Sequence, residues 1–208
     1  MLTDQEHRQV ADAIKAAEEK TSGEIYCVVC RQSDPYFMAA AFVLSCAALV
    51  IGTLSAWVLY WLWIDIGTAT FTTALFCAWL LAIILIWQFP ALRLRFVTKA
   101  VRYRRSHAQA VQQFLAHNIH ATPERTGVLV FVSLAERYAE VVADSGISER
   151  VGQENWNSVV AIIIDGAAKG RLADALTTAA QDIGAHLARH FPASSTDRNE
   201  LPDRVVEM

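Results

Sequence analysis

Two long uncharged segments constrain this 208-residue chain more than any other feature. The 30 residues between Asp34 and Asp65 carry no charged side chain, and neither do the 27 residues between Asp65 and Arg93. Each segment is longer than the roughly 20 apolar residues that a helix needs to cross a bilayer. We therefore predict a transmembrane helical hairpin over residues 37–90, with a very short turn at Asp65.

The alternative is a buried helical hairpin in a soluble protein. Helices at 37–63 and 67–90 would then have to be covered on all sides, which requires far more chain than remains. Aromatic residues also gather near the helix ends, as they do at membrane–water interfaces. These residues are Tyr36, Phe37, Trp57, Tyr60, Trp61, Trp63, Trp87 and Phe89.

Six basic residues with no acidic residue among them follow the second apolar segment. They form what we call the basic collar: Arg93, Arg95, Lys99, Arg102, Arg104 and Arg105. The turn between the two helices has no basic residue. The positive-inside rule therefore predicts that both termini lie on the cytoplasmic side of a bacterial-type inner (plasma) membrane. The collar is also expected to contact anionic lipid headgroups at the membrane interface.

The charge of the remaining chain argues against a nucleic-acid partner. The chain has 18 basic and 21 acidic residues; without the collar and Asp65, 12 basic and 20 acidic residues remain, a net charge of −8. Proteins that bind nucleic acid usually present a basic surface. No nucleic-acid partner is therefore expected.

The stretch T-S-G-E-I-Y-C-V-V-C, residues 21–30, predicts a strand at 24–30, and a strand needs a hydrogen-bonding partner. The best partner is G-V-L-V-F-V-S at 127–133, and a further strand at 138–144 completes a β-hairpin. A predicted helix at 97–117 makes the connection a crossover, which favours parallel pairing of 24–30 with 127–133.

One α/β domain is thus predicted from two parts, residues 1–36 and 91–191. A helix at 3–20 begins with the capping box of Thr3 and Glu6. Apolar residues at helical spacing predict two more helices, at 153–168 and 172–190. The polar tail at 192–208 is expected to be disordered.

The four cysteines do not form a recognisable metal or redox motif. Cys27 and Cys30 have C-x-x-C spacing, but residues three apart in a strand point to opposite faces. Cys46 and Cys77 lie in the apolar segments. We expect four buried, reduced cysteines.

The arrangement of these parts resembles the TPM domain family. The resemblance rests on T-S-G-E-I-Y-C-V-V at 21–29 and R-T-G-V-L-V-F-V-S-L-A-E-R-Y-A-E-V-V-A-D-S-G-I at 125–147. It implies a three-layer α/β/α domain, here with a transmembrane hairpin inserted after the first strand. Some family members are acid phosphatases, some bind calcium and others modulate membrane receptors. Common members carry the domain outside the cytoplasm, which differs from the orientation predicted here.

Candidate ligand-binding residues lie where the predicted strands end. Asp34 and Glu136 follow the carboxyl ends of the two paired strands, where open α/β sheets bind ligands, and the adjacent Arg137 could meet an anion. Asp144 and Glu149 at the other end are candidate ligands for a divalent cation such as calcium. The alternative for each carboxylate is a turn or a helix N-cap.

Small residues recur every four positions in both apolar segments, which allows close helix packing. They are Ala48, Gly52 and Ala56 in the first, and Thr70, Ala74, Ala78 and Ala82 in the second. We expect these residues to pack the two helices on each other, with a homo-oligomer as the second interpretation. Neither helix carries a charge, which argues against a transporter or ion pathway.

These observations predict an integral membrane protein whose cytoplasmic TPM-like domain is a membrane-tethered binding or regulatory module for an unknown protein partner. No catalytic motif such as a Walker loop, a Cys-x5-Arg loop or H-E-x-x-H is present. The alternative, a metal-dependent acid phosphatase, follows from the family resemblance.

Overall fold

The computed structural model describes residues 2–122, 125–193, 202 and 204–208. Contacts divide the chain into two compact units. We call residues Met1–Ser33 with Tyr103–Met208 the α/β unit, and Asp34–Arg102 the helical unit. The α/β unit is therefore built from two segments that are distant in sequence.

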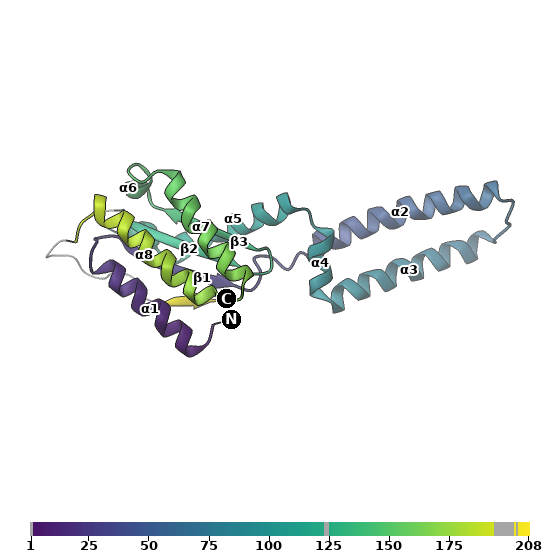
Figure 1. Ribbon diagram of the computed structural model, residues 1–208. Helices are drawn as coiled ribbons and strands as arrows, with labels where there is room; N and C mark the ends of the chain where they lie inside the picture. The colour runs from purple at the N-terminus through teal and green to yellow at the C-terminus, as the bar shows by residue number, and fades with distance from the viewer. Residues whose placement is uncertain (1, 123–124, 194–201, 203) are drawn as a thin grey trace. The chain divides into compact units, whose positions relative to one another are not determined.

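A four-stranded mixed sheet forms the centre of the α/β unit, with the strand order β3-β2-β1-β4 (Figure 1). Strand β1 (Glu24–Cys30) pairs in parallel with β2 (Gly127–Ser133), and β2 pairs antiparallel with β3 (Tyr138–Ala143). The predicted parallel pairing and the predicted β-hairpin are both confirmed.

The fourth strand corrects the expectation of a disordered tail at 192–208. Residues Val205–Glu207 form β4, which pairs in parallel with β1 opposite Cys27, Val28 and Val29. The Met208 N–H also donates to Val29 O at 3.0 Å. Backbone pairing to the free edge of β1 stabilises this short strand, and composition alone does not reveal such a partner. Residues 194–201 and 203 lie outside the described residues.

Helices pack on both faces of the sheet, so the fold is mixed α/β as predicted. Helices α1 (Asp4–Glu18), α7 (Gln153–Ala168) and α8 (Leu172–His190) share one apolar core with one face of the sheet. Helix α5 (Lys99–Ala116) supplies Ala110 and Phe114 to the core on the other face. The short helices η1 (Ile119–Ala121) and α6 (Ser145–Ser148) lie in the connections.

Local sequence signals determine where α1 begins and which side chains lie on each face of β1. Thr3 and Glu6 form the predicted capping box: Glu6 N–H donates to Thr3 Oγ1 at 3.3 Å and Thr3 N–H to Glu6 Oε2 at 2.7 Å. Cys27 and Cys30 are buried on opposite faces of the sheet, as their spacing predicts.

The helical unit contains two long apolar helices, α2 (Phe37–Trp61) and α3 (Thr68–Gln88), followed by α4 (Pro90–Phe96). Both long helices have the length and composition needed to cross a membrane. The sequence did not predict α4, although Pro90 at its first position is a recognised helix-start signal.

The contact between α2 and α3 corrects the expected packing of small residues. In α2, Gly52 is buried, and a Cβ there would approach Leu75 Cδ2 to 2.7 Å. In α3, however, Thr70, Ala74 and Ala78 are exposed and only Ala82 is half-buried, and the α3 side chain next to Gly52 is the larger Leu75. Cys46 and Cys77 are also exposed, so only two of the four cysteines are buried.

Candidate functional site

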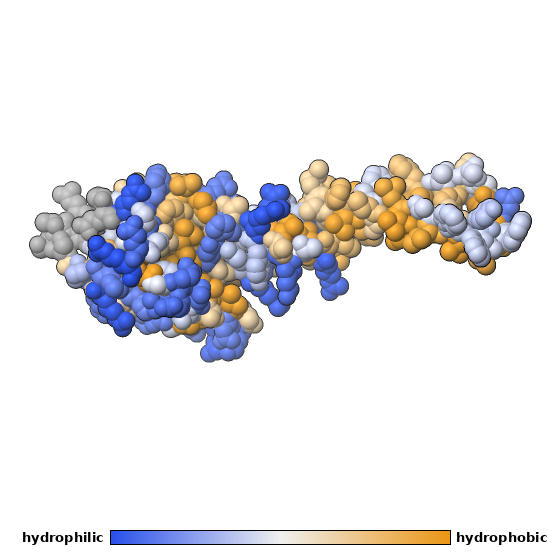
Figure 2. Space-filling model, turned by 90° about the horizontal axis from the view of Figure 1, so that it is seen from above, coloured by the Kyte–Doolittle hydropathy of each residue, from blue (hydrophilic) through white to orange (hydrophobic). Residues whose placement is uncertain are grey.

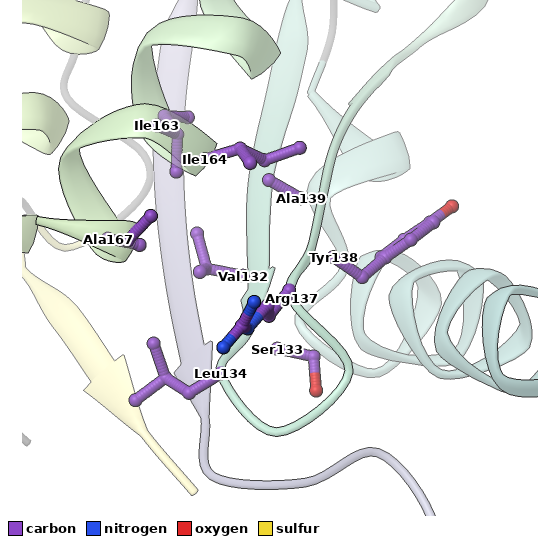
Figure 3. Close-up of a pocket in the computed structure, with 10 residues that line it drawn as sticks. Val132, Ser133, Leu134, Arg137, Tyr138, Ala139, Ile163, Ile164 and Ala167 are labelled. Atoms are coloured by element: carbon purple, nitrogen blue, oxygen red, sulfur yellow. The ribbon is translucent and has the colours of Figure 1, made fainter. Parts of the chain in front are cut away.

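A cavity of about 330 Å³ lies between the β2–β3 hairpin and α7 in the α/β unit (Figure 3). Its walls include Val132, Leu134 and Ala139 from the hairpin, and Ile163, Ile164 and Ala167 from α7. Large aliphatic residues form most of the walls, while the short side chains of Ala139, Ala167 and Ala168 leave space between the hairpin and the helix. A cavity of this size is at the lower end of the range for small-molecule sites.

Arg137 is the only charged residue among the described residues that line this cavity. Figure 3 shows its guanidinium directed into the space near Val132, Leu134 and Ala167. The side chain is exposed, and no carboxylate among the described residues forms an ion pair with it. The cavity therefore combines an apolar interior with one fixed positive charge.

The backbone at Arg137 adopts a conformation that non-glycine residues avoid. Its φ is 52°, and its N–H donates to Leu134 O at 3.2 Å to close the turn between β2 and β3. A left-handed non-glycine residue costs roughly 1–2 kcal/mol. The turn geometry thus places this arginine at some cost to stability.

Glu136 occupies a different environment from Arg137. It is 3% exposed and belongs to a buried polar group that we call the serine–glutamate cluster, which contains Ser33, Ser106, Ser133 and Glu136. Ser33 N–H donates to Glu136 Oε1 at 3.0 Å, and the Ser133 hydroxyl donates to Glu136 Oε2. Both carboxylate oxygens accept a hydrogen bond within the cluster.

The serine hydroxyls extend this cluster across three segments of the α/β unit. Ser33 Oγ lies 2.9 Å from Ser133 Oγ and 3.1 Å from Ser106 Oγ, which belongs to α5. Figure 3 shows the Ser133 and Tyr138 side chains pointing away from the cavity interior. The cluster therefore lies beyond the turn, on the side of the sheet that faces α5.

Tyr138 takes part in a second polar group on the same side. Its hydroxyl donates to Glu140 Oε2 at 2.8 Å, and Glu140 Oε1 lies 2.8 Å from His107 Nδ1. Burial of the ring, followed by its hydrogen bond to the Glu140 carboxylate, raises the pKa of the Tyr138 phenol. This group links β3 to α5 and contributes no inward-facing side chain to the cavity.

The structure does not bring the three predicted ligand-binding residues together in one site. Arg137 lines the cavity, Glu136 is buried in the serine–glutamate cluster, and Asp34 belongs to the helical unit. Asp34 Oδ1 accepts the Tyr36 N–H at 2.7 Å just before α2 begins, which is a common role for Asp at such a position.

Asp144 has the helix-cap role that was the alternative to metal binding. Its Oδ1 accepts the Ser145 N–H at 2.6 Å at the start of α6 and lies 3.9 Å from Arg125 Nη1. Glu149 is exposed at the end of the same helix. In the described part of the chain, no three His, Cys, Asp or Glu side chains are grouped to hold a metal ion.

The basic collar separates into residues with different roles. Arg93 donates from Nε to Ile86 O at 2.8 Å, from Nη2 to Trp87 O at 2.8 Å and from Nη1 to Pro35 O at 3.3 Å. It therefore caps the carboxyl end of α3 and ties it to the segment before α2. Arg95, Lys99, Arg104 and Arg105 are exposed, and Arg102 is half-buried.

Sequence reasoning missed the cavity and the serines around Glu136. The cavity depends on where small residues from β3 and α7 meet, which no short motif encodes. Ser33, Ser106 and Ser133 are single serines in unrelated segments. The one available signal was Arg137 in a tight turn, which predicted an anion contact but not the apolar space beside it.

Comparisons with known proteins extend the description of the fold. No family model matches the chain, and no curated protein matches it. The NMR structure of BA42 protein from the psychrophilic bacterium Bizionia argentinensis is similar, with a TM-score of 0.62. The match covers 100% of this chain and 96% of that one at 19% sequence identity, a similarity that extends to the fold alone.

Proposed function

We propose that the chain is a two-pass integral membrane protein whose α/β unit is a TPM-like binding or regulatory module tethered to the bilayer. The apolar surface of α2 and α3 carries this proposal. Only 11% of the most apolar stretch of α2 and 6% of that of α3 are buried, whereas the core helix of a soluble protein is mostly buried. Figure 2 shows that most of the visible surface in the middle of the helical unit is hydrophobic.

The energetic argument concerns the large side chains of these helices. Leu49 is 69% exposed on α2 and Leu81 is 58% exposed on α3, and many neighbours are similar. Burial of each such side chain is favourable by roughly 1.5–3 kcal/mol relative to exposure in water. A bilayer provides this burial without a further protein chain, and the helix lengths match its hydrocarbon thickness.

The charge distribution supports an inward orientation. The exposed collar residues lie in α4 and α5, after α3, and the α2–α3 turn carries Asp65 but no basic residue. By the positive-inside rule, both termini and the α/β unit lie on the cytoplasmic side of a bacterial-type inner membrane. Arg95, Lys99 and Arg104 then attract anionic headgroups, since Arg93 is committed to backbone carbonyls.

The binding role rests on the cavity, which offers a preformed site next to Arg137, an arginine without an ion-pair partner among the described residues. An unknown protein partner would bind the α/β unit differently when this site is occupied and when it is empty. The alternative, a metal-dependent phosphatase, requires ligands gathered around an ion. The assignment of Asp144 and Glu149 as metal ligands remains a prediction, because the described residues contain no group of three potential ligands that could hold an ion.

Alkaline washing of membranes that contain the protein tests whether the chain is anchored in the bilayer. The full chain should remain in the membrane pellet after washing at about pH 11, a treatment that releases peripheral proteins. Leu49→Arg with Leu81→Arg should reduce the amount inserted, since an arginine at a helix centre costs roughly 2.5–3.5 kcal/mol. The matched control is Leu115→Arg, at a 53% exposed position on α5 in the α/β unit. Release of the unaltered chain by the wash would contradict the proposal.

A further inference from the structure

We propose that the cavity between the β2–β3 hairpin and α7 binds a small amphipathic monocarboxylate, with its apolar tail in the cavity and its carboxylate on Arg137. This inference names the ligand class of the binding module and rests on the proposed function in that respect. It does not depend on how the helical unit meets the membrane.

The cavity wall selects for an apolar group. The side chains that form it include Val132, Leu134, Ala139, Ile163, Ile164 and Ala167, none of which can donate or accept a hydrogen bond. Ser133 and Tyr138 also border the cavity, but their hydroxyls point away from it and bond to Glu136 and Glu140. A sugar or another polyhydroxylated ligand would leave polar groups without partners here.

Arg137 selects for an anion. Its guanidinium faces the cavity and has no ion-pair partner in the described part of the chain. The nearest acidic residue in sequence, Glu136, already accepts hydrogen bonds from Ser33 and Ser133. The positive charge at the cavity is therefore available to a ligand.

The donor set favours a carboxylate over a phosphate. A guanidinium presents parallel N–H groups that match the two oxygens of a planar carboxylate. A phosphate dianion has three terminal oxygens and is usually held by several donors. The lining residues within the described ranges include no lysine, histidine or second arginine, so one monoanionic head fits best.

The backbone conformation at Arg137 also supports a ligand-binding role for this residue. A glycine would adopt the φ of 52° without strain, yet the turn holds an arginine whose side chain enters the cavity. Strained residues of this kind recur at ligand-binding positions. Arg137→Gly therefore separates the two roles of the position, because it removes the charge and relieves the backbone.

Binding of octanoate to the full chain in lipid nanodiscs tests the proposal, with empty nanodiscs measured in parallel to subtract partitioning into lipid. Equilibrium dialysis should show saturable binding to the protein. Arg137→Gln and Arg137→Gly should each weaken it at least tenfold, while Arg137→Gly should unfold no more readily than the unaltered chain. The matched control is Arg189→Gln, at an exposed position on α8 that does not line the cavity, which should bind as the unaltered chain does.

A second pair of variants tests the cavity itself. Ala168→Phe fills the rim at an exposed position that lines the cavity and should abolish binding. Ala161→Phe, exposed on the same helix but outside the cavity, should leave it unchanged. Equal octanoate binding by Ala168→Phe and the unaltered chain would overturn the assignment of this cavity as the binding site.

Ligand analogues test the class of ligand. Octanol should bind the unaltered chain and Arg137→Gln equally weakly, and octyl phosphate should bind less tightly than octanoate. Tighter binding of octyl phosphate, or no saturable octanoate binding above the empty nanodisc, would overturn the monocarboxylate proposal. Neither result would affect the membrane extraction, so failure here is distinguishable from failure of the anchoring.

Discussion

Ser33 N–H donates a 3.0 Å hydrogen bond to Glu136 Oε1, although 103 positions separate the two residues. Ser33 is the last residue of the first segment of the α/β unit, and Ser106 lies close to the start of the second. Both contact the serine–glutamate cluster, through Glu136, Ser133 or each other. This cluster therefore joins the two segments of the α/β unit at the carboxyl ends of β1 and β2.

Glu136→Gln should destabilise the α/β unit by about 1.5–3 kcal/mol. A glutamine offers one acceptor oxygen in place of two, so either Ser33 N–H or the Ser133 hydroxyl faces an amide NH2 group. Denaturant unfolding of the purified protein measures this change in the free energy of unfolding, with the susceptibility of the α/β unit to proteolysis as the signal. Ser133→Ala should destabilise the α/β unit by a similar amount, because it removes the buried hydroxyl that donates to the Glu136 carboxylate.

Glu149→Gln is the matched control for Glu136→Gln. Glu149 is exposed, and its side chain forms no hydrogen bond within the described chain. Its substitution should change stability by less than about 0.5 kcal/mol. Equal effects at positions 136 and 149 would refute the role assigned to the cluster.

Arg93→Gln should loosen the carboxyl end of α3, while Arg95→Gln should not. Arg93 supplies donors to Ile86 O and Trp87 O, which otherwise lack partners at the end of the helix. Hydrogen exchange in lipid should show lost protection at the last turn of α3 only in the Arg93 variant. Both variants should be tested for binding to vesicles with anionic lipid; only Arg95→Gln should weaken it. Weaker vesicle binding by Arg93→Gln alone would contradict this division of roles.

Cys27 should make the stability of the α/β unit sensitive to alkaline pH. Burial raises the pKa of its thiol from 9.0 to about 12. A raised pKa in the folded state means that the stability is fully present below pH 9 and declines between pH 9 and 12, as the thiol ionises in the unfolded chain. The expected slope from this one group is about 1.4 kcal/mol per pH unit.

Comparison of pH profiles isolates the Cys27 contribution from other alkaline titrations. The free energy of unfolding of the unaltered chain should fall more steeply between pH 9 and 10.5 than that of Cys27→Val. Val28→Ala removes buried volume next to it without a titrating group, so its profile should run parallel to that of the unaltered chain. Parallel profiles for Cys27→Val and the unaltered chain would show that the thiol is not held in its protonated form.

Much of the α/β unit could be predicted from sequence because its signals are local or strongly apolar. The capping box at Thr3 is a short pattern, and β1 and β2 are apolar runs buried on both faces. The pairing of β1 with β2 followed from the need of each strand for a partner, together with the helical crossover. The predicted pairing is correct although a long apolar segment separates the two strands in sequence.

The features that escaped prediction depend on contacts between distant segments. Strand β4 has only three residues and exists through its pairing with β1. Glu136 was predicted as a ligand-binding residue, but Ser33 and Ser133 engage its carboxylate. The cavity beside Arg137 reflects unfilled space at Ala139 and Ala167, which periodicity cannot reveal.

The central claim is that α2 and α3 cross a bilayer and return the chain to the same side, and labelling of single cysteines in sealed inside-out vesicles tests it most directly. Cys46 and Cys77 are replaced by alanine, while Cys27 and Cys30 remain, because both are buried and burial raises the pKa of each thiol. Single cysteines are then introduced at the exposed positions Asp12, Asp65 and Ala161.

A maleimide that does not cross membranes should label Asp12→Cys and Ala161→Cys in intact inside-out vesicles, whose outer surface is the cytoplasmic face. Asp65→Cys should react only after the vesicles are permeabilised. Labelling of Asp65→Cys in intact vesicles together with the other two would contradict a membrane-spanning hairpin. Labelling of Asp65→Cys alone would keep the two-pass arrangement and reverse its orientation.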